Sequence, residues 1–91
     1  MQLQGLPAGD LIRRGIEDLR RDDLTVPALL VAIGAPRLRR LGLEIPDRGV
    51  AEPEHRLYAH LAALEPEAAH ARYNALIRRL VRFERAAECL S

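Results

Sequence analysis

The chain has 91 residues, of which 14 are basic and 13 are acidic, so its formal net charge is only +1. A chain of this length is expected to form one domain, residues 1–91, whose core needs no metal or disulfide. The single cysteine excludes an internal disulfide and a cysteine-based zinc site, and an apolar share of 48% is too high for a disordered protein.

Helix-forming residues dominate the composition. Leu, Ala and Arg occur 16, 14 and 14 times, whereas the β-branched and aromatic residues that strands favour are scarce. Lys is absent, and Ala, Arg, Gly and Pro together make up 40 of the 91 positions. Because the codons of these four residues are rich in G and C, we expect the protein to come from a GC-rich, bacterial genome.

The sequence predicts no membrane-spanning or secreted segment. No apolar run approaches the ~18 residues of a membrane span, and the first residues lack the charged start and apolar stretch of a signal peptide. We therefore expect a cytoplasmic protein. Its one cysteine, Cys89, is then reduced in the cell, although it offers an intermolecular disulfide in an oxidised sample.

The first predicted helix spans about residues 8–21, and Pro7 or Asp10 marks its start. Gly15 lies inside the helical pattern, which indicates a close contact with another helix. Its apolar face is made by Leu11, Ile12, Ile16 and Leu19. On the opposite face we expect the ion pairs Asp10–Arg14, Arg14–Asp18 and Glu17–Arg21.

Residues 25–42 resemble a helix-turn-helix in a generic way. Thr25 is the expected N-cap of an apolar helix over residues 28–33, which Gly34 ends. Pro36 then opens a short helix that Gly42 ends. Interpreted as a helix-turn-helix, the segment suggests an alternative function, nucleic-acid binding, with candidate contacts Arg37, Arg39 and Arg40. The second helix carries no Gln, Asn, Ser or Thr for base edges, which disfavours the alternative.

The loop over residues 43–52 separates these N-terminal helices from a C-terminal helical pair. The pair comprises a helix over Pro53–Leu64 and a long helix over Pro66–Glu88. The long helix has an apolar stripe at strict helical spacing, formed by Ala69, Tyr73, Leu76, Leu80, Phe83, Ala87 and Leu90. The predicted fold is therefore all-α, a small four- to five-helix bundle or orthogonal helical array with a long C-terminal helix.

The length of the last helix predicts self-association. A helix of this length spans roughly 35 Å, whereas a compact domain of this size is about 30 Å across. Its apolar end would then meet a second copy in a homodimer, unless Met1–Leu6 folds back over it. The candidate self-association stripe is Leu80, Phe83, Ala87 and Leu90.

Charge is distributed unevenly in the C-terminal half. Residues 51–71 hold one Arg and four Glu, a net charge of −3, whereas residues 72–91 hold five Arg and two Glu, a net charge of +3. Three arginines lie on the side of the long helix opposite the stripe: Arg78, Arg82 and Arg85. They are four and three residues apart, so they repel one another instead of forming ion pairs. We treat them as a candidate partner-binding ridge for an acidic protein surface or a phosphate backbone. A solvated face near the C-terminal helix dipole is the other interpretation.

One acidic residue, Glu84, falls inside the apolar stripe of the last helix. A buried and unpaired carboxylate is costly, so we expect Glu84 to pair with Arg13 or Arg20 of the first helix. Alternatively, Glu84 faces a groove and meets the cation of a partner.

The sequence offers little chemistry for catalysis or for cofactors. His55 and His60 are five residues apart and do not share a helix face, so metal ligation has no support. A third hypothesis for the function is a small enzyme, which would need Glu54, His55 and His60 in one cleft. We expect instead a non-enzymatic interaction module, a regulatory or adaptor protein without cofactor or metal that self-associates and that offers its arginines to an acidic surface.

Overall fold

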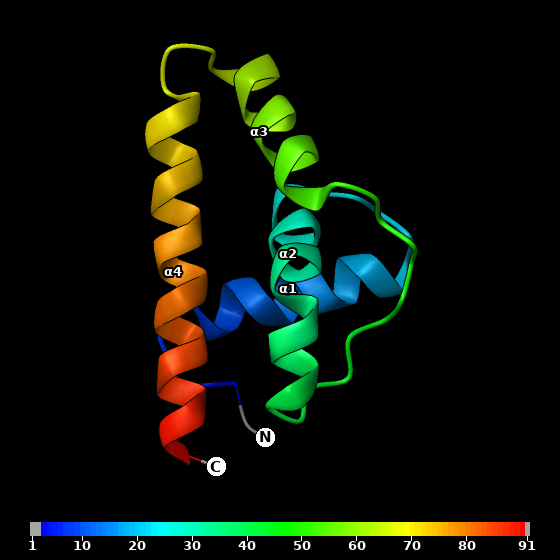
Figure 1. Cartoon of the computed structure of the whole chain (residues 1–91), viewed down its shortest axis with the longest axis vertical. Coiled ribbons are helices and arrows are strands. Elements are labelled where there is room, and N and C mark those ends of the chain that lie inside the picture. Colours follow the sequence, from blue (N-terminus) through cyan, green and yellow to red (C-terminus); the bar gives the residue numbers. More distant parts are fainter. Residues whose placement is uncertain (1–2, 91) are drawn as a thin grey trace.

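The protein is all-helical. The computed structural model describes residues 3–90, and within this range it has four helices and no strand. Figure 1 shows α4 along the long axis, with α3 and α2 stacked beside it and α1 lying across α2. The helices are α1, Gly9–Arg20; α2, Val26–Arg40; α3, Pro53–Leu64; and α4, Ala69–Leu90. The bounds of α3 match the prediction, and no helix of residues 3–90 is both long and apolar enough to cross a membrane.

The contact between α1 and α2 depends on Gly15, as the sequence predicts. A Cβ atom added at Gly15 would lie 2.3 Å from the carbonyl oxygen of Pro27 and 2.4 Å from Cγ2 of Val31. The predicted N-cap is also confirmed, because the Thr25 hydroxyl oxygen accepts a hydrogen bond of 3.2 Å from the Ala28 backbone N–H. Close backbone approach and a capped helix start therefore fix the α1–α2 corner.

The predicted break in α2 is wrong. Gly34 does not end a helix, and Pro36 lies inside the single helix Val26–Arg40. The physical reason is packing against α4, because a Cβ atom at Gly34 would lie 2.9 Å from Cδ1 of Leu80. Glycine is used here to bring two helices together, and α2 tolerates the one hydrogen bond that Pro36 removes. Residues 25–42 therefore contain no helix-turn-helix.

The predicted self-association stripe is mostly core. Leu80, Phe83 and Ala87 are buried inside the chain against the other helices, so they present no surface to a second copy. Only Leu90 is exposed, at 67%. The N-terminal segment contributes to this outcome, since the side chains of Leu3 and Leu6 pack on the core. Met1 and Gln2 of the predicted fold-back lie outside the described residues, and the described N-terminal segment lies at the same end of the molecule as the C-terminal end of α4 (Figure 1).

The ion pairs of α1 differ from the predicted set. Arg13 lies 3.6 Å from Asp10 and 3.4 Å from Glu17, so it replaces Arg14 as the central cation of this face. Arg21 pairs with Asp18 and not with Glu17. The difference arises because Asp18 faces α2, where it is buried.

Candidate functional site

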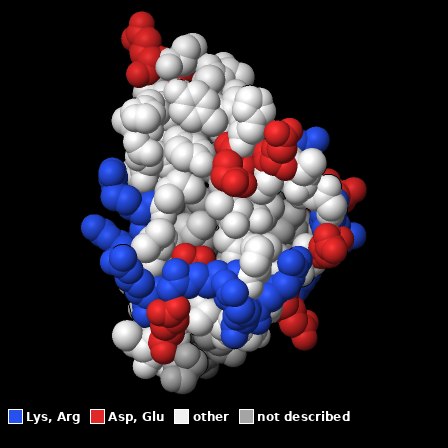
Figure 2. Space-filling model, in the orientation of Figure 1, with Lys and Arg blue, Asp and Glu red and all other residues white. Residues whose placement is uncertain are grey.

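Arginines gather on one half of the molecule. Figure 2 shows a band of basic side chains across the lower half of one face, over α4 and the lower end of α2. The upper half of the same face, over α3 and the first turns of α4, is mostly uncharged surface with a few acidic side chains. The two sequence-predicted arginine clusters lie in this lower half, and their side chains have different environments.

The ridge on α4 is exposed. Arg78, Arg82 and Arg85 are exposed on the side of α4 that faces away from the core. Among the described residues none of the three makes an ion pair or a side-chain hydrogen bond, and the same holds for Arg79 beside them. Four cations without acidic partners therefore follow one another over two turns of the helix. Their charge is available to a partner.

Two of the three arginines on α2, Arg37 and Arg39, bind other parts of the chain. The Arg37 guanidinium bridges to α4, where it lies 3.8 Å from Oε1 of Glu84 and also pairs with Glu88. The predicted partners of Glu84, Arg13 and Arg20, are therefore wrong. They lie on α1, whereas Glu84 faces Gly34 of α2.

Glu84 is buried, as expected, with 5% of its surface exposed. Burial raises the pKa of its carboxyl above the ordinary value of 4.5, and the attraction of Arg37 opposes this only in part. The charged form is thus disfavoured at this helix contact.

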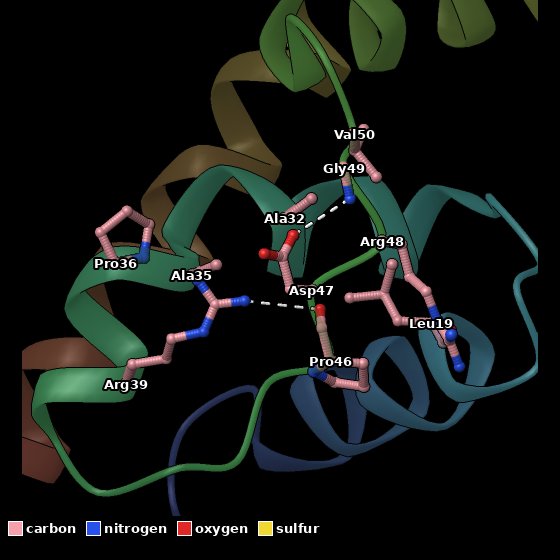
Figure 3. A pocket seen from close by; sticks show the side chains of 10 residues that line it. All are labelled: Leu19, Ala32, Ala35, Pro36, Arg39, Pro46, Asp47, Arg48, Gly49 and Val50. Carbon is pink, nitrogen blue, oxygen red and sulfur yellow. Dashed lines mark hydrogen bonds between the residues drawn. The ribbon is translucent and has the colours of Figure 1, made fainter.

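Two other arginines, Arg39 and Arg48, hold the loop that follows α2, and their side chains line the cavity beneath it (Figure 3). The Arg39 guanidinium donates to the carbonyl oxygens of Ile45 and Pro46, at 3.0 and 3.4 Å. Arg48 donates to the carbonyl oxygens of Leu19 and Arg20, both at 2.7 Å, and so satisfies the C-terminal end of α1. The cavity holds about 190 Å³. Of the three candidate nucleic-acid contacts, only Arg40 is both exposed and without such a bond in residues 3–90.

An apolar groove lies between α3, the first half of α4 and the start of α2. Its volume is about 310 Å³, and Leu64 on its wall is 64% exposed. On its α4 side two arginines form the rim: Arg72, which lies 2.6 Å from Glu65, and Arg79, which has no acidic partner among the described residues. The lining residues are Val26, Leu61, Leu64, Arg72, Ala75, Leu76 and Arg79. Helical spacing places Leu61 and Leu64 on the same side of α3 as the buried Leu57, so the spacing predicts that Leu64 faces inward. The exposure of Leu64 is therefore seen only in the structure.

The residues that a small enzyme would need in one cleft do not contribute to these two surfaces. Glu54, His55 and His60 are exposed on α3 and line neither the groove nor the cavity under the loop. Within residues 3–90 no group of three or more His, Cys, Asp or Glu side chains is placed to hold a metal ion. Cys89 is exposed near the end of α4.

The sequence predicts that Asp18 pairs with Arg14 on the face of the first helix opposite its apolar residues, but Asp18 lies on the buried face. It is buried, accepts a hydrogen bond of 2.6 Å from the Thr25 hydroxyl and pairs with Arg21. The Thr25 hydrogen bond is the main reason that the pKa of Asp18 lies below its ordinary value of 3.8. Its spacing of three from Gly15 and seven from Leu11 places it on the helix face that meets α2, a signal present in the sequence.

The chain matches no protein-family model, no curated protein and no solved structure. The function of these surfaces is therefore inferred from their own residues.

Proposed function

We propose that the protein is a non-enzymatic interaction module whose α4 ridge, Arg78, Arg82 and Arg85, binds an acidic surface of a partner protein. One observation carries this proposal: the three ridge arginines lie together on one exposed face of α4 and have no acidic partner among the described residues, whereas Arg13, Arg21, Arg37 and Arg72 each make an ion pair. Arginine also suits this role because its planar guanidinium binds carboxylates through two hydrogen bonds.

Self-association through the α4 stripe is not part of the proposal, because three of its four residues are buried in the chain. Nucleic-acid binding has less support than protein binding. Arg37 and Arg39 are held by Glu88 and by loop carbonyls, and α2 is one continuous helix. Nucleic acid therefore serves as the competing outcome in the test.

The test compares a short fluorescein-labelled acidic peptide with a DNA duplex of similar charge, by fluorescence anisotropy at low and physiological salt. The variant R78Q/R82Q/R85Q should lose affinity for the peptide by about tenfold, since three exposed ion pairs are together worth roughly 1–2 kcal/mol. The matched control R20Q/R40Q/R56Q removes the same charge from three exposed arginines outside the ridge. It should lose much less.

Two results would contradict the proposal. Equal losses in the ridge variant and the control would mean that only net charge matters. Tighter binding of the DNA, with an affinity that falls steeply as salt rises, would favour the nucleic-acid alternative.

A further inference from the structure

The groove between α3 and α4 is an open apolar surface with a basic rim. Its wall includes Leu64, which remains 64% exposed although it is a large apolar residue at the end of α3. A volume of about 310 Å³ lies at the lower end of the range of ligand sites and has room for an inserted apolar side chain. The surface is therefore suited to an apolar group that the described chain does not itself supply.

The charge of the rim restricts the partner. Glu65 neutralises Arg72, but Arg79 has no acidic partner among residues 3–90. Arg82 follows Arg79 by three residues, so the two are neighbours on the surface of α4 and connect the groove to the ridge. A partner that fills the groove would thus meet positive charge along one side.

We propose that this groove binds an amphipathic helix of a partner protein, with its apolar stripe in the groove and its acidic flank on Arg79 and Arg82. This rests on the proposed function, because it specifies the form that the acidic partner takes. A groove bounded by two helices accepts a third helix through apolar residues spaced at three and four positions, with polar residues on its flanks.

A second copy of the chain fits the groove less well. An isologous interface centred on the groove would place the same patch on both sides of the symmetry axis. Arg79, which has no acidic partner among residues 3–90, would then lie close to its own copy, and like charges at an interface oppose binding. Charge complementarity therefore favours an acidic helix from another protein.

The direct probe is a fluorescein-labelled amphipathic peptide with leucine at every third or fourth position and glutamate on the flanks. A scrambled peptide of the same composition has the same charge but no apolar stripe. The wild-type protein should bind the amphipathic peptide at least about tenfold more tightly than the scrambled one, a difference of about 1.4 kcal/mol.

Two variants test the groove without disturbing the core. Leu64→Ser removes an exposed apolar wall, and Ala75→Glu places an acid one turn before Arg79, where it would pair with that cation. Both should abolish the preference for the amphipathic peptide. Leu90→Ser, at 67% exposure, and Ala59→Glu, on the exposed side of α3, are matched controls that should retain it.

The outcomes separate this proposal from the proposed function. If Leu64→Ser keeps the full preference while R78Q/R82Q/R85Q loses affinity for both peptides, the groove proposal fails and the ridge stands. If the ridge variant binds as the wild type does, the proposed function fails. A wild-type dimer in light scattering that Leu64→Ser dissociates would show that a second copy fills the groove, and would overturn the proposal of an acidic helix.

Discussion

The α1–α2 corner and the α3–α4 hairpin use their apolar residues differently. In the corner, Gly15 lets the backbone of α1 approach the Pro27 carbonyl and the Val31 side chain of α2 closely. Ile12, Leu19 and Leu30 are fully buried there. In the hairpin, α3 buries only Leu57 and Leu61, and Leu64 lies open beside the groove. The fold leaves this apolar surface of the hairpin uncovered, and it is the surface that we propose a partner helix binds.

The largest effect is expected in the enclosed core. Phe83→Ala removes a ring with no exposed surface and leaves a cavity, so the free energy of unfolding should fall by about 3–5 kcal/mol. Urea denaturation measures this loss. Leu90→Ala on the same helix serves as the control, and its change should stay within about 0.5 kcal/mol because that side chain is exposed. Similar losses in both would show that the burial of α4 is not as described.

The two helix-packing glycines should differ. Gly15→Ala places a methyl group against a backbone carbonyl that cannot move alone, so we expect a net loss of about 2 kcal/mol in the free energy of unfolding. Gly34→Ala meets the flexible end of Leu80 and, at 3.3 Å, Oε2 of the Glu84 side chain, but no backbone atom, and it gains helix propensity, so its change should stay within about 1 kcal/mol. A reversed order in urea denaturation would contradict the close approach of α1 and α2.

Two buried acids should give opposite pH dependences. The pKa of Glu84 is raised by burial, so the folded chain holds this proton more tightly, and stability falls as pH rises from about 4.5 through the raised value. Glu84→Gln should flatten this part of the curve and raise the melting temperature at neutral pH. Melting temperatures measured across pH test it, and an unchanged curve would contradict the burial of Glu84.

Asp18 acts at lower pH. Its pKa is lowered, chiefly by the Thr25 hydrogen bond, so its stabilising contribution is present above about 3.8 and is lost as pH falls through the folded value. Asp18→Asn should therefore reduce the loss of stability in acid. Above about pH 4.5 the change of stability with pH should stay as in the wild type, because Glu84 determines it there. Acid titration followed by circular dichroism measures this, and equal acid midpoints in the two proteins would refute it.

The smallest stability effect is expected in the groove. Leu64→Ser and Ala75→Glu change exposed side chains, so each should alter the free energy of unfolding by no more than about 0.5 kcal/mol. Urea denaturation of both variants, with Leu61→Ala as the buried comparison from the same helix, measures the contrast. A loss above about 2 kcal/mol for Leu64→Ser would mean that the hairpin needs this residue to fold.

Local signals in the sequence predicted the helices well and their contacts less well. Proline and threonine near helix starts, together with apolar spacing, located α3 and the N-cap of α2, because these signals act within one turn. Gly34 could not be interpreted in the same way, since a glycine that ends a helix and one that admits a neighbouring helix look alike in sequence. The partner of Glu84 and the burial of Asp18 depend on which helices meet, and periodicity within one helix does not determine that.

The same limit applies to the candidate surfaces. The ridge is predictable because it depends on the spacing within α4 alone, and the structure does place Arg78, Arg82 and Arg85 on an exposed face. The stripe was misassigned because the rest of the chain covers Leu80, Phe83 and Ala87. The groove needs three elements and therefore appears only in the structure.

The α3–α4 groove, in this proposal, serves binding and not folding. The most direct test measures, on one preparation of Leu64→Ser, both the urea midpoint and the affinity for the amphipathic acidic peptide. We predict an unchanged midpoint together with at least a tenfold loss of affinity relative to the wild type. An unchanged affinity, or an affinity lost only in proportion to a lowered midpoint, would contradict the claim.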